Sequence, residues 1–358
     1  MSDNAVPLST TAREAERLMT ICNSCRYCEG YCAVFPAMER RMNFVEADLD
    51  YLANLCHNCA ECYYACQYAP PHEFAVNVPK AFAELRAETY RKYAWPAPLA
   101  ATFQSKRIAI PWAVGLAALA ISVANPAGST FYAVVPHEAM VGIFLAASAL
   151  ILTAHLAGFL RFWGATGETI ARFLKPAALV QAVRDVLSMK NLGSGGAGCT
   201  YPNRRHSPAR RIFHHFTFYG FALCFASTTV AALYHFSGFV APYAYTSVPV
   251  ILGTLGGAGL LIGPVGLYLL KRRRDQEIAD PAQDGSDVTF LALLFLTSVT
   301  GLLLLALRGT PAMGVLLLVH LAVVLVLFLT LPYGKFVHGI YRSAALVKAA
   351  VEGLEKRP

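Results

Sequence analysis

The chain has 358 residues, of which 56% are hydrophobic, and its mean hydropathy is +0.45. An ordinary soluble domain is less apolar, so length and composition together predict two units, one of which lies in a lipid bilayer. The formal net charge is +8. The basic residues stand between apolar runs and no DNA- or RNA-binding motif accompanies them. The charge therefore favours retention on the cytoplasmic side of a membrane, with no nucleic acid as partner.

Cysteines are concentrated near the start of the chain. Eight of the ten fall between Cys22 and Cys66. The first twenty residues are polar and lack the apolar segment of a secretory signal, so this region is expected to be cytoplasmic. Clustered cysteines in the cytoplasm indicate metal binding rather than disulfides.

The eight cysteines form two runs with the same spacing, C-x2-C-x2-C-x3-C. This spacing is typical of ferredoxins with two [4Fe–4S] clusters, in which the fourth cysteine of each run binds the other cluster. Structural zinc uses four ligands from two C-x2–4-C pairs and fits the pattern poorly. The first predicted cluster is bound by Cys22, Cys25, Cys28 and Cys66, and the second by Cys56, Cys59, Cys62 and Cys32.

The segment between the runs, Met38–Leu55, carries apolar residues at helical spacing. It predicts a helix, and so an α-helical ferredoxin domain rather than a small β-rich one. His57 and His72 beside the runs are interpreted as ordinary polar loop residues.

The composition changes near Trp95-Pro96. Residues 1–95 are assigned to a cytoplasmic ferredoxin domain and residues 96–358 to a transmembrane domain. Six apolar runs in the second part are long enough to cross a hydrocarbon core of about 30 Å. They are 108–124, 137–160, 212–236, 246–270, 288–307 and 312–333, and the first is the shortest.

Basic residues alternate between the connections of these runs. Segments 125–136 and 237–245 contain no Lys or Arg, whereas 161–211 contains nine and 271–287 opens with four in a row. The positive-inside rule then predicts six spans with both termini in the cytoplasm. We therefore expect an all-α protein of the bacterial cytoplasmic (inner) membrane, with 161–211 as a cytoplasmic loop.

Within that loop, 168–190 predicts an amphipathic helix, and Gly193–Gly198 follows it. The glycine run satisfies G-x-G-x-x-G formally, but it neither follows a predicted strand nor opens a βαβ unit. We interpret it as a flexible turn rather than a dinucleotide site.

Histidines stand near the ends of three predicted spans. Ionisable residues there are candidates for function. The pairs His137/His155 and His320/His338 are each 18 residues apart, which is five helical turns and about 27 Å. Each pair is therefore expected on one helix face, with one ring near each membrane surface. The residues expected toward the cytoplasm are His155, His214, His215 and His338, and those toward the outside are His137, His235 and His320.

Two neutral imidazoles from facing helices can hold a six-coordinate haem b, which suits electron transfer. The sequence has no C-x-x-C-H, so covalent haem is excluded. The bland alternative is that the histidine rings simply lie at the membrane interface, and in that case the membrane domain is an anchor without haem.

The segments that carry these residues resemble known families. Residues 22–66 resemble the helical ferredoxin domain of heterodisulfide-reductase C-type subunits. The last span, from His320 to His338, resembles the haem-binding γ subunit of respiratory nitrate reductase. That resemblance implies that His338 binds a cytoplasmic-side haem with His214, and that His320 binds an outer one. Cys224 stands where that family has another histidine, so the outer haem would use His137 or His235, or be absent.

Nearly the whole chain resembles the citrate-utilization B family, also called tricarballylate utilization protein B. The resemblance rests on the cysteine runs, Gly198–Pro202 and Arg211–Gly220. It implies a protein that reoxidises a separate FAD-dependent dehydrogenase, tricarballylate dehydrogenase, and passes electrons through [4Fe–4S] clusters and haem b to the quinone pool. Quinone reductase activity would then need the flavoprotein partner. The alternative is a thiol–disulfide subunit like heterodisulfide reductase, with Cys199 facing a substrate.

Overall fold

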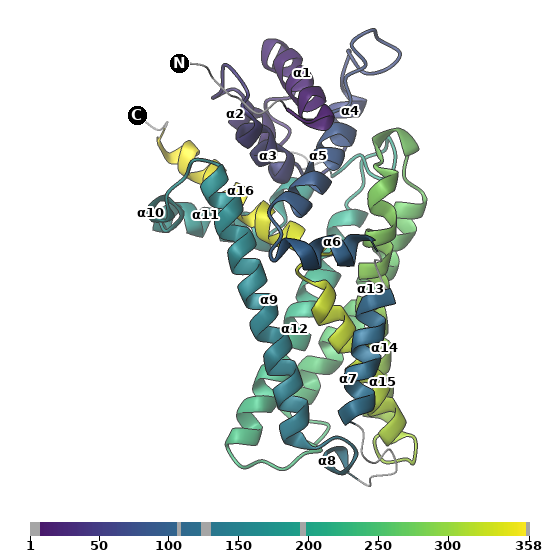
Figure 1. Cartoon of the computed structure of the whole chain (residues 1–358). Coiled ribbons are helices and arrows are strands. Elements are labelled where there is room, and N and C mark those ends of the chain that lie inside the picture. The colour runs from purple at the N-terminus through teal and green to yellow at the C-terminus, as the bar shows by residue number, and fades with distance from the viewer. Residues whose placement is uncertain (1–7, 106–108, 123–129, 194–197, 356–358) are drawn as a thin grey trace.

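The computed structural model describes residues 8–105, 109–122, 130–193 and 198–355. Within these ranges the secondary structure is helical, apart from one isolated antiparallel bridge between Cys199 and Ser207, which confirms the predicted all-α class. Long helices lie side by side in a bundle, and the shorter N-terminal helices cover one end of it (Figure 1).

The N-terminal helices pack around an apolar core, which they share with the C-terminal helix and the helices of the 161–211 loop. The Ser9 hydroxyl caps one long helix and the Asn77 side chain caps another, each by accepting a hydrogen bond from a backbone N–H of the first turn. Their inner faces bury Leu18, Leu52 and Phe82 completely. The helices are α1 (Thr10–Cys25), α2 (Val34–Met38), α3 (Glu46–Leu55), α4 (Glu61–Tyr64) and α5 (Val78–Lys92).

The predicted helix over Met38–Leu55 is wrong in its first half. The chain turns after Met38 and α3 begins only at Glu46. The carbonyl of Arg41 accepts a hydrogen bond from the Asn23 side chain (2.8 Å) instead of continuing a helical ladder. The Arg41 guanidinium meanwhile binds Asp48, which fixes the turn against the start of α3.

Among the described residues, five helices are long and apolar enough to cross a membrane. The described part of the first predicted span forms a shorter helix of 14 residues, and the ends of that span lie outside the described residues. A further helix, α6 (Ala97–Ser105), lies across the bundle rather than along it (Figure 1). The helices of the bundle are α7 (Ala109–Ser122), α9 (His137–Ala165), α12 (Ala209–Phe236), α13 (Val248–Arg272), α14 (Asp284–Leu307) and α15 (Met313–Thr330), with the short α8 (Phe131–Val134) between α7 and α9.

Helices α12 and α13 pack with their backbones in direct contact. A Cβ on Gly220 would lie 2.9 Å from the carbonyl oxygen of Gly256, and one on Gly263 would lie 2.6 Å from the backbone nitrogen of Thr217. In lipid, where apolar side chains gain little by packing together, small residues let helices approach closely and gain dispersion energy. This glycine seam therefore fixes α12 and α13 as one hairpin.

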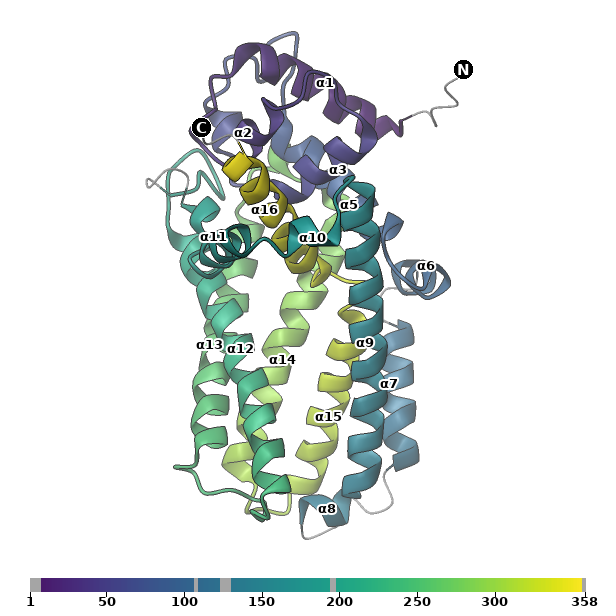
Figure 2. The same ribbon diagram turned by 90° about the vertical axis from the view of Figure 1, so that its left-hand side faces the viewer.

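The last predicted span does not continue to His338. Helix α15 ends at Thr330, and after a turn α16 (Val337–Glu355) leaves the bundle along the end that the N-terminal helices cover (Figure 2). Pro332 has no N–H for the helical ladder, and the N–H of Gly334 closes the turn onto the Thr330 carbonyl (2.8 Å). The expectation that His320 and His338 share one continuous helix is thus wrong.

By contrast, His137 and His155 both lie on α9, as expected. The predicted amphipathic helix 168–190 is interrupted by Pro176, which starts a second helix. The loop contains α10 (Ile170–Phe173), α11 (Pro176–Leu187) and the 3-10 turn η1 (Lys190–Leu192), and α10 and α11 lie beside α16 (Figure 2).

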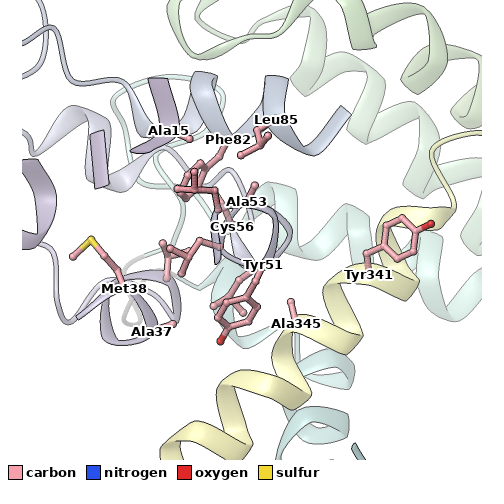
Figure 3. Packing of buried hydrophobic residues seen from close by; sticks show 14 of the residues in the cluster. Ala15, Ala37, Met38, Tyr51, Ala53, Cys56, Phe82, Leu85, Tyr341 and Ala345 are labelled. Atoms are coloured by element: carbon pink, nitrogen blue, oxygen red, sulfur yellow. The ribbon is translucent and has the colours of Figure 1, made fainter. Parts of the chain in front are cut away.

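Helix α16 joins the two parts of the molecule. Ala345 lies opposite Tyr51 of α3, and Tyr341 lies further along the same helix toward the bundle (Figure 3). At its C-terminal part, Glu352 forms a nearly buried ion pair with Arg41 (2.7 Å, side chains 13% and 11% exposed). The Tyr51 hydroxyl also donates to Glu352 (3.3 Å). This contact ties the last helix to the turn before α3.

Replacing Glu352 with Ala should loosen the N-terminal domain, because Arg41 then keeps only one carboxylate partner, Asp48, in a nearly dry site. Removing one partner of a buried pair costs about 3 kcal/mol. A lower midpoint of thermal unfolding and faster proteolysis between the domain and the bundle would report it. Glu355→Ala removes a surface pair with Arg172 and serves as the control, with no expected shift. Equal stability of the two variants would contradict the anchoring role.

Candidate functional site

The eight cysteines of the two runs line two adjoining cavities in the N-terminal domain. The larger cavity has a volume of about 220 Å³. Cys66, from the second run, lines it together with the first three cysteines of the first run, and Cys32, from the first run, lines the smaller cavity with cysteines of the second. The larger cavity is lined by Cys22, Cys25, Cys28, Cys62 and Cys66, and the smaller by Cys32, Cys56, Cys59 and Cys62.

This arrangement fits two four-thiol donor sets. All of these cysteines are free thiols. The described residues contain no group of three or more His, Cys, Asp or Glu that could hold a single ion. In a cubane cluster each cysteine binds a different iron, so the sulfurs stand further apart than the ligands of one ion. Backbone N–H groups of Asn58 and Tyr68 point at the sulfurs of Cys56 and Cys66 (both 3.4 Å), a type of contact that tunes cluster potentials.

In the absence of a metal, burial disfavours the charged thiolate form of these cysteines. Burial, followed by the neighbouring thiols Cys66 and Cys25, raises the pKa of Cys28 to about 12. Burial and the same kind of neighbours also raise the pKa of Cys22 to about 12. Metal binding would therefore have to release protons, as it does wherever thiolates are ligands.

The segment that follows the glycine run packs beside the smaller cavity, where the Thr200 hydroxyl donates to the Cys59 carbonyl (3.3 Å). Residues 194–197 of the glycine run itself lie outside the described residues. Gly198 has φ +95°, and a Cβ there would lie 2.9 Å from the backbone of Ser207, so glycine is required. The next residue, Cys199, is fully buried in the same apolar cluster as Cys59, and its thiol donates to the Leu192 carbonyl (3.0 Å). Cys199 therefore faces the protein interior rather than a substrate.

Two of the candidate histidines meet directly beneath this cavity. The ring centres of His214 on α12 and His338 on α16 are 6.2 Å apart. Imidazoles that bind one iron from opposite sides at about 2 Å have ring centres roughly 6 Å apart. Nδ1 of His338 hydrogen-bonds to the Lys335 carbonyl, which leaves Nε2 free to bind a metal. Nδ1 of His214 is buried without a partner. The pair fits the two axial positions of a haem.

Three arginines connect the histidine pair with the loop of the second cysteine run. Arg342, one turn after His338, donates to the carbonyl of Cys56 (2.8 Å). Arg210, one turn before His214, donates to the carbonyl of Asn58 (2.6 Å). Sequence reasoning missed the third, Arg86, which also donates to the carbonyl of Cys56 (2.8 Å) and shows in sequence only as one of several charges along α5.

These arginines lie where charge is costly. Burial, followed by repulsion from Arg86, lowers the pKa of Arg342 to about 10. Its Nε atom is buried without a partner. An unpaired guanidinium nitrogen beside the histidine pair fits an anionic group such as a haem propionate.

His57 was interpreted from sequence as an ordinary loop residue, but in the structure it is half-buried beside these arginines. Burial, followed by Arg342, lowers its pKa well below the usual value, so the ring is neutral. Its Nδ1 lies 2.8 Å from the Leu55 carbonyl, which holds the ring against the cysteine loop. No sequence signal distinguishes this histidine from an exposed one.

The remaining histidines form no comparable pair. His137 and His235 stack at the far end of the bundle with ring centres 4.1 Å apart, which is too close for an iron between them. His320 hydrogen-bonds to Thr300 (3.0 Å) and, among the described ring contacts, touches neither. His155 and His215 each have Nε2 buried and unpartnered.

Comparison with known proteins agrees with this architecture. Residues 96–358 match the family model described as citrate utilization protein B, and residues 15–92 match the model of its Fer4-like domain. The chain belongs to the citrate utilization protein B family. It is 48% identical over 357 residues to a protein of Escherichia coli described as citrate utilization protein B, covering 96% of this chain and 93% of that protein. No solved structure matches the chain.

Membership in the citrate utilization protein B family, with its Fer4-like domain and five helices fit to cross a membrane, indicates an iron–sulfur electron-transfer protein of a membrane. The cysteine pattern and the helical domain agree with the family model.

Serine in place of Cys66 or Cys22 should remove the same cluster, because both thiols line the larger cavity, whereas Cys32→Ser should remove the other. Each variant should keep about four of about eight irons per chain. Iron and sulfide assays with electron paramagnetic resonance of the reduced protein measure this. Cys224→Ser, on α12 away from both cavities, is the control. Loss of different signals in Cys66→Ser and Cys22→Ser would contradict the crossed grouping.

Proposed function

We propose that the protein reoxidises a separate FAD-dependent dehydrogenase, of the tricarballylate dehydrogenase class, and delivers the electrons to quinone in the bilayer. In this proposal the eight cysteines hold two [4Fe–4S] clusters, and His214 and His338 hold a haem b. The observation that carries the proposal is the clamp of Arg210 and Arg342, which sets the second cysteine loop directly on the histidine pair.

When bound, these groups would accept and release electrons one at a time, which connects a two-electron flavin to a membrane acceptor. The exposure of the cysteines indicates which of the two cavities would receive electrons first. Cys25 is exposed at the end of α1, so the larger cavity is the accessible one for a docking flavoprotein. Cys56 and Cys59 are each only 7% exposed and face the bundle. Electrons would thus enter at the outer cavity and leave toward α12 and α16.

The residues around the histidine pair keep it neutral and oriented. Hydrogen bonding of His338 Nδ1 to the Lys335 carbonyl selects the tautomer that binds iron through Nε2. Arg342 has a buried nitrogen without a partner and would neutralise a propionate. The proposal is limited to one haem, since His137 and His235 would have to separate before they could bind a second with His320.

The membrane arrangement is part of the same proposal. With α7 as a sixth crossing, both ends of the chain lie on the same side of the membrane. Helices α1 and α16 accordingly lie at the same end of the bundle (Figure 1). Lys271–Arg274 and the loop 161–211 also lie toward that end, which supports a cytoplasmic N-terminal domain, residues 1–95, in a bacterial inner membrane.

His338→Ala and His214→Ala should each abolish the low-spin haem b spectrum, because one axial ligand is lost. Optical spectra of the detergent-purified protein, oxidised and then reduced with dithionite, together with a haem assay, give the result. His215→Ala is the matched control, since it changes the next residue of the same helix and should keep the haem. The absence of haem from the unaltered protein, or its loss only in His215→Ala, would contradict the proposed ligation.

Cys199→Ser tests the thiol–disulfide alternative. Because Cys199 is buried, and serine can replace the hydrogen bond from its thiol to the Leu192 carbonyl, flavoprotein-dependent quinone reduction should stay within about twofold of the unaltered rate. Loss of activity with intact cluster and haem spectra would favour the alternative, in which this thiol takes part in the chemistry.

A further inference from the structure

A second large cavity lies where the N-terminal domain meets the bundle, between α5, α6, α14 and the turn that joins α15 to α16. Its volume is about 210 Å³. Helix α6 crosses the bundle at this level (Figure 1), which in the proposed membrane arrangement is near the membrane surface. The cysteine and histidine sites do not use it.

Aromatic rings form the walls of this cavity. Phe103 of α6 and Tyr333 of the turn stack with ring centres 5.0 Å apart and planes 27° from parallel. Phe290 of α14 and Tyr90 of α5 also line it. Flat rings arranged in this way suit another planar ring, which can stack or lie edge-on against them.

The polar end of the cavity is formed by an ion pair. The Lys335 ammonium lies 2.8 Å from Asp287, and Asp287 is also paired with Lys271 (2.7 Å). The ammonium lines the cavity and can donate a hydrogen bond to a ligand there. A neutral ligand with a carbonyl oxygen would meet a charged donor there without adding net charge.

The cavity is adjacent to the histidine pair. The carbonyl of Lys335 hydrogen-bonds to Nδ1 of His338. Phe336, the next residue, contacts Phe290 in the cavity wall with ring centres 6.3 Å apart. The short turn between α15 and α16 therefore lines this cavity and also orients His338, the histidine on which the proposed function depends.

We propose that this cavity binds the head group of a quinone, with one carbonyl oxygen accepting a hydrogen bond from Lys335 and the isoprenoid tail in the bilayer. The inference rests on the proposed function and assigns its acceptor site. The quinone gains two electrons and two protons and becomes a quinol. The electrons come from the reduced flavin of the partner dehydrogenase, and the protons come from cytoplasmic water.

An anionic lipid head group fits the cavity less well. Asp287 already neutralises Lys335, which leaves Arg91 at the cavity edge as the other cation. Phosphate binding sites normally combine several unpaired cations or backbone N–H groups. Stacked aromatic walls favour a planar, neutral ring.

The experiment uses the full-length protein in phosphatidylcholine nanodiscs, reduced with stoichiometric dithionite and mixed anaerobically with decylubiquinone or menadione. Ser286→Phe fills the cavity from α14. Val288→Phe adds the same side chain two residues away, at an exposed site that does not line the cavity. Lys335→Met removes the donor without adding volume. Ferricyanide, a soluble acceptor that needs no quinone site, reports whether the rest of the protein is intact.

We expect Ser286→Phe and Lys335→Met to slow reoxidation by quinone at least about tenfold, which corresponds to the loss of one charge-assisted hydrogen bond or of the ring's space. Val288→Phe should react like the unaltered protein, and ferricyanide should reoxidise all four equally. Lys335→Met decides the matter if Ser286→Phe does not fold.

Two other outcomes have distinct meanings. If quinone does not reoxidise even the unaltered protein, the proposed function fails together with this site. If quinone reoxidises the unaltered protein and both cavity variants equally fast, the function stands and this site is overturned. Inhibition of the unaltered protein by added phosphatidylglycerol, with quinone rates unchanged in the variants, would assign the cavity to a lipid phosphate and overturn it as well.

Discussion

The loop from Cys56 to Asn58 is held by three arginines from three different helices, and the relation between the two parts of the molecule depends on this clamp. Arg86 comes from α5, Arg210 from α12 and Arg342 from α16. Buried guanidinium groups are costly unless their N–H groups are satisfied, and here the backbone carbonyls of the cysteine loop accept one hydrogen bond from each arginine. The charges that would stabilise anionic cofactors thus also fix the distance between the two candidate cofactor sites.

Much of this was accessible from the sequence, because the decisive signals are local. The spacing of the cysteines predicts which of them meet, and Cys66 and Cys32 do lie in the cavities of the opposite runs. The pairing of His214 with His338 agrees with the resemblance to the nitrate reductase subunit, although the two histidines do not reach each other as expected. His338 arrives on a separate helix, because Pro332 ends the apolar helix that hydropathy alone would continue.

The sequence does not predict features that are formed by residues far apart in the chain. The cavity beside Lys335 is lined by residues of α5, α6, α14 and the turn after α15, so the sequence of no single segment predicts it. Likewise, His57 and Arg86 look ordinary until the fold brings them together. Hydropathy reports whether a segment prefers lipid, whereas these features depend on which segments become neighbours.

The glycine seam between α12 and α13 has a consequence for the speed of electron transfer. Backbones in direct contact at Gly220 and Gly256 cannot slide or tilt without a steric clash, so His214 is carried by a stiff hairpin. A redox centre changes its charge at each step, and surroundings that barely move keep the reorganisation energy small. In the proposed arrangement, the packing of α12 on α13 less than two turns from His214 would therefore keep the activation barrier for electron transfer low.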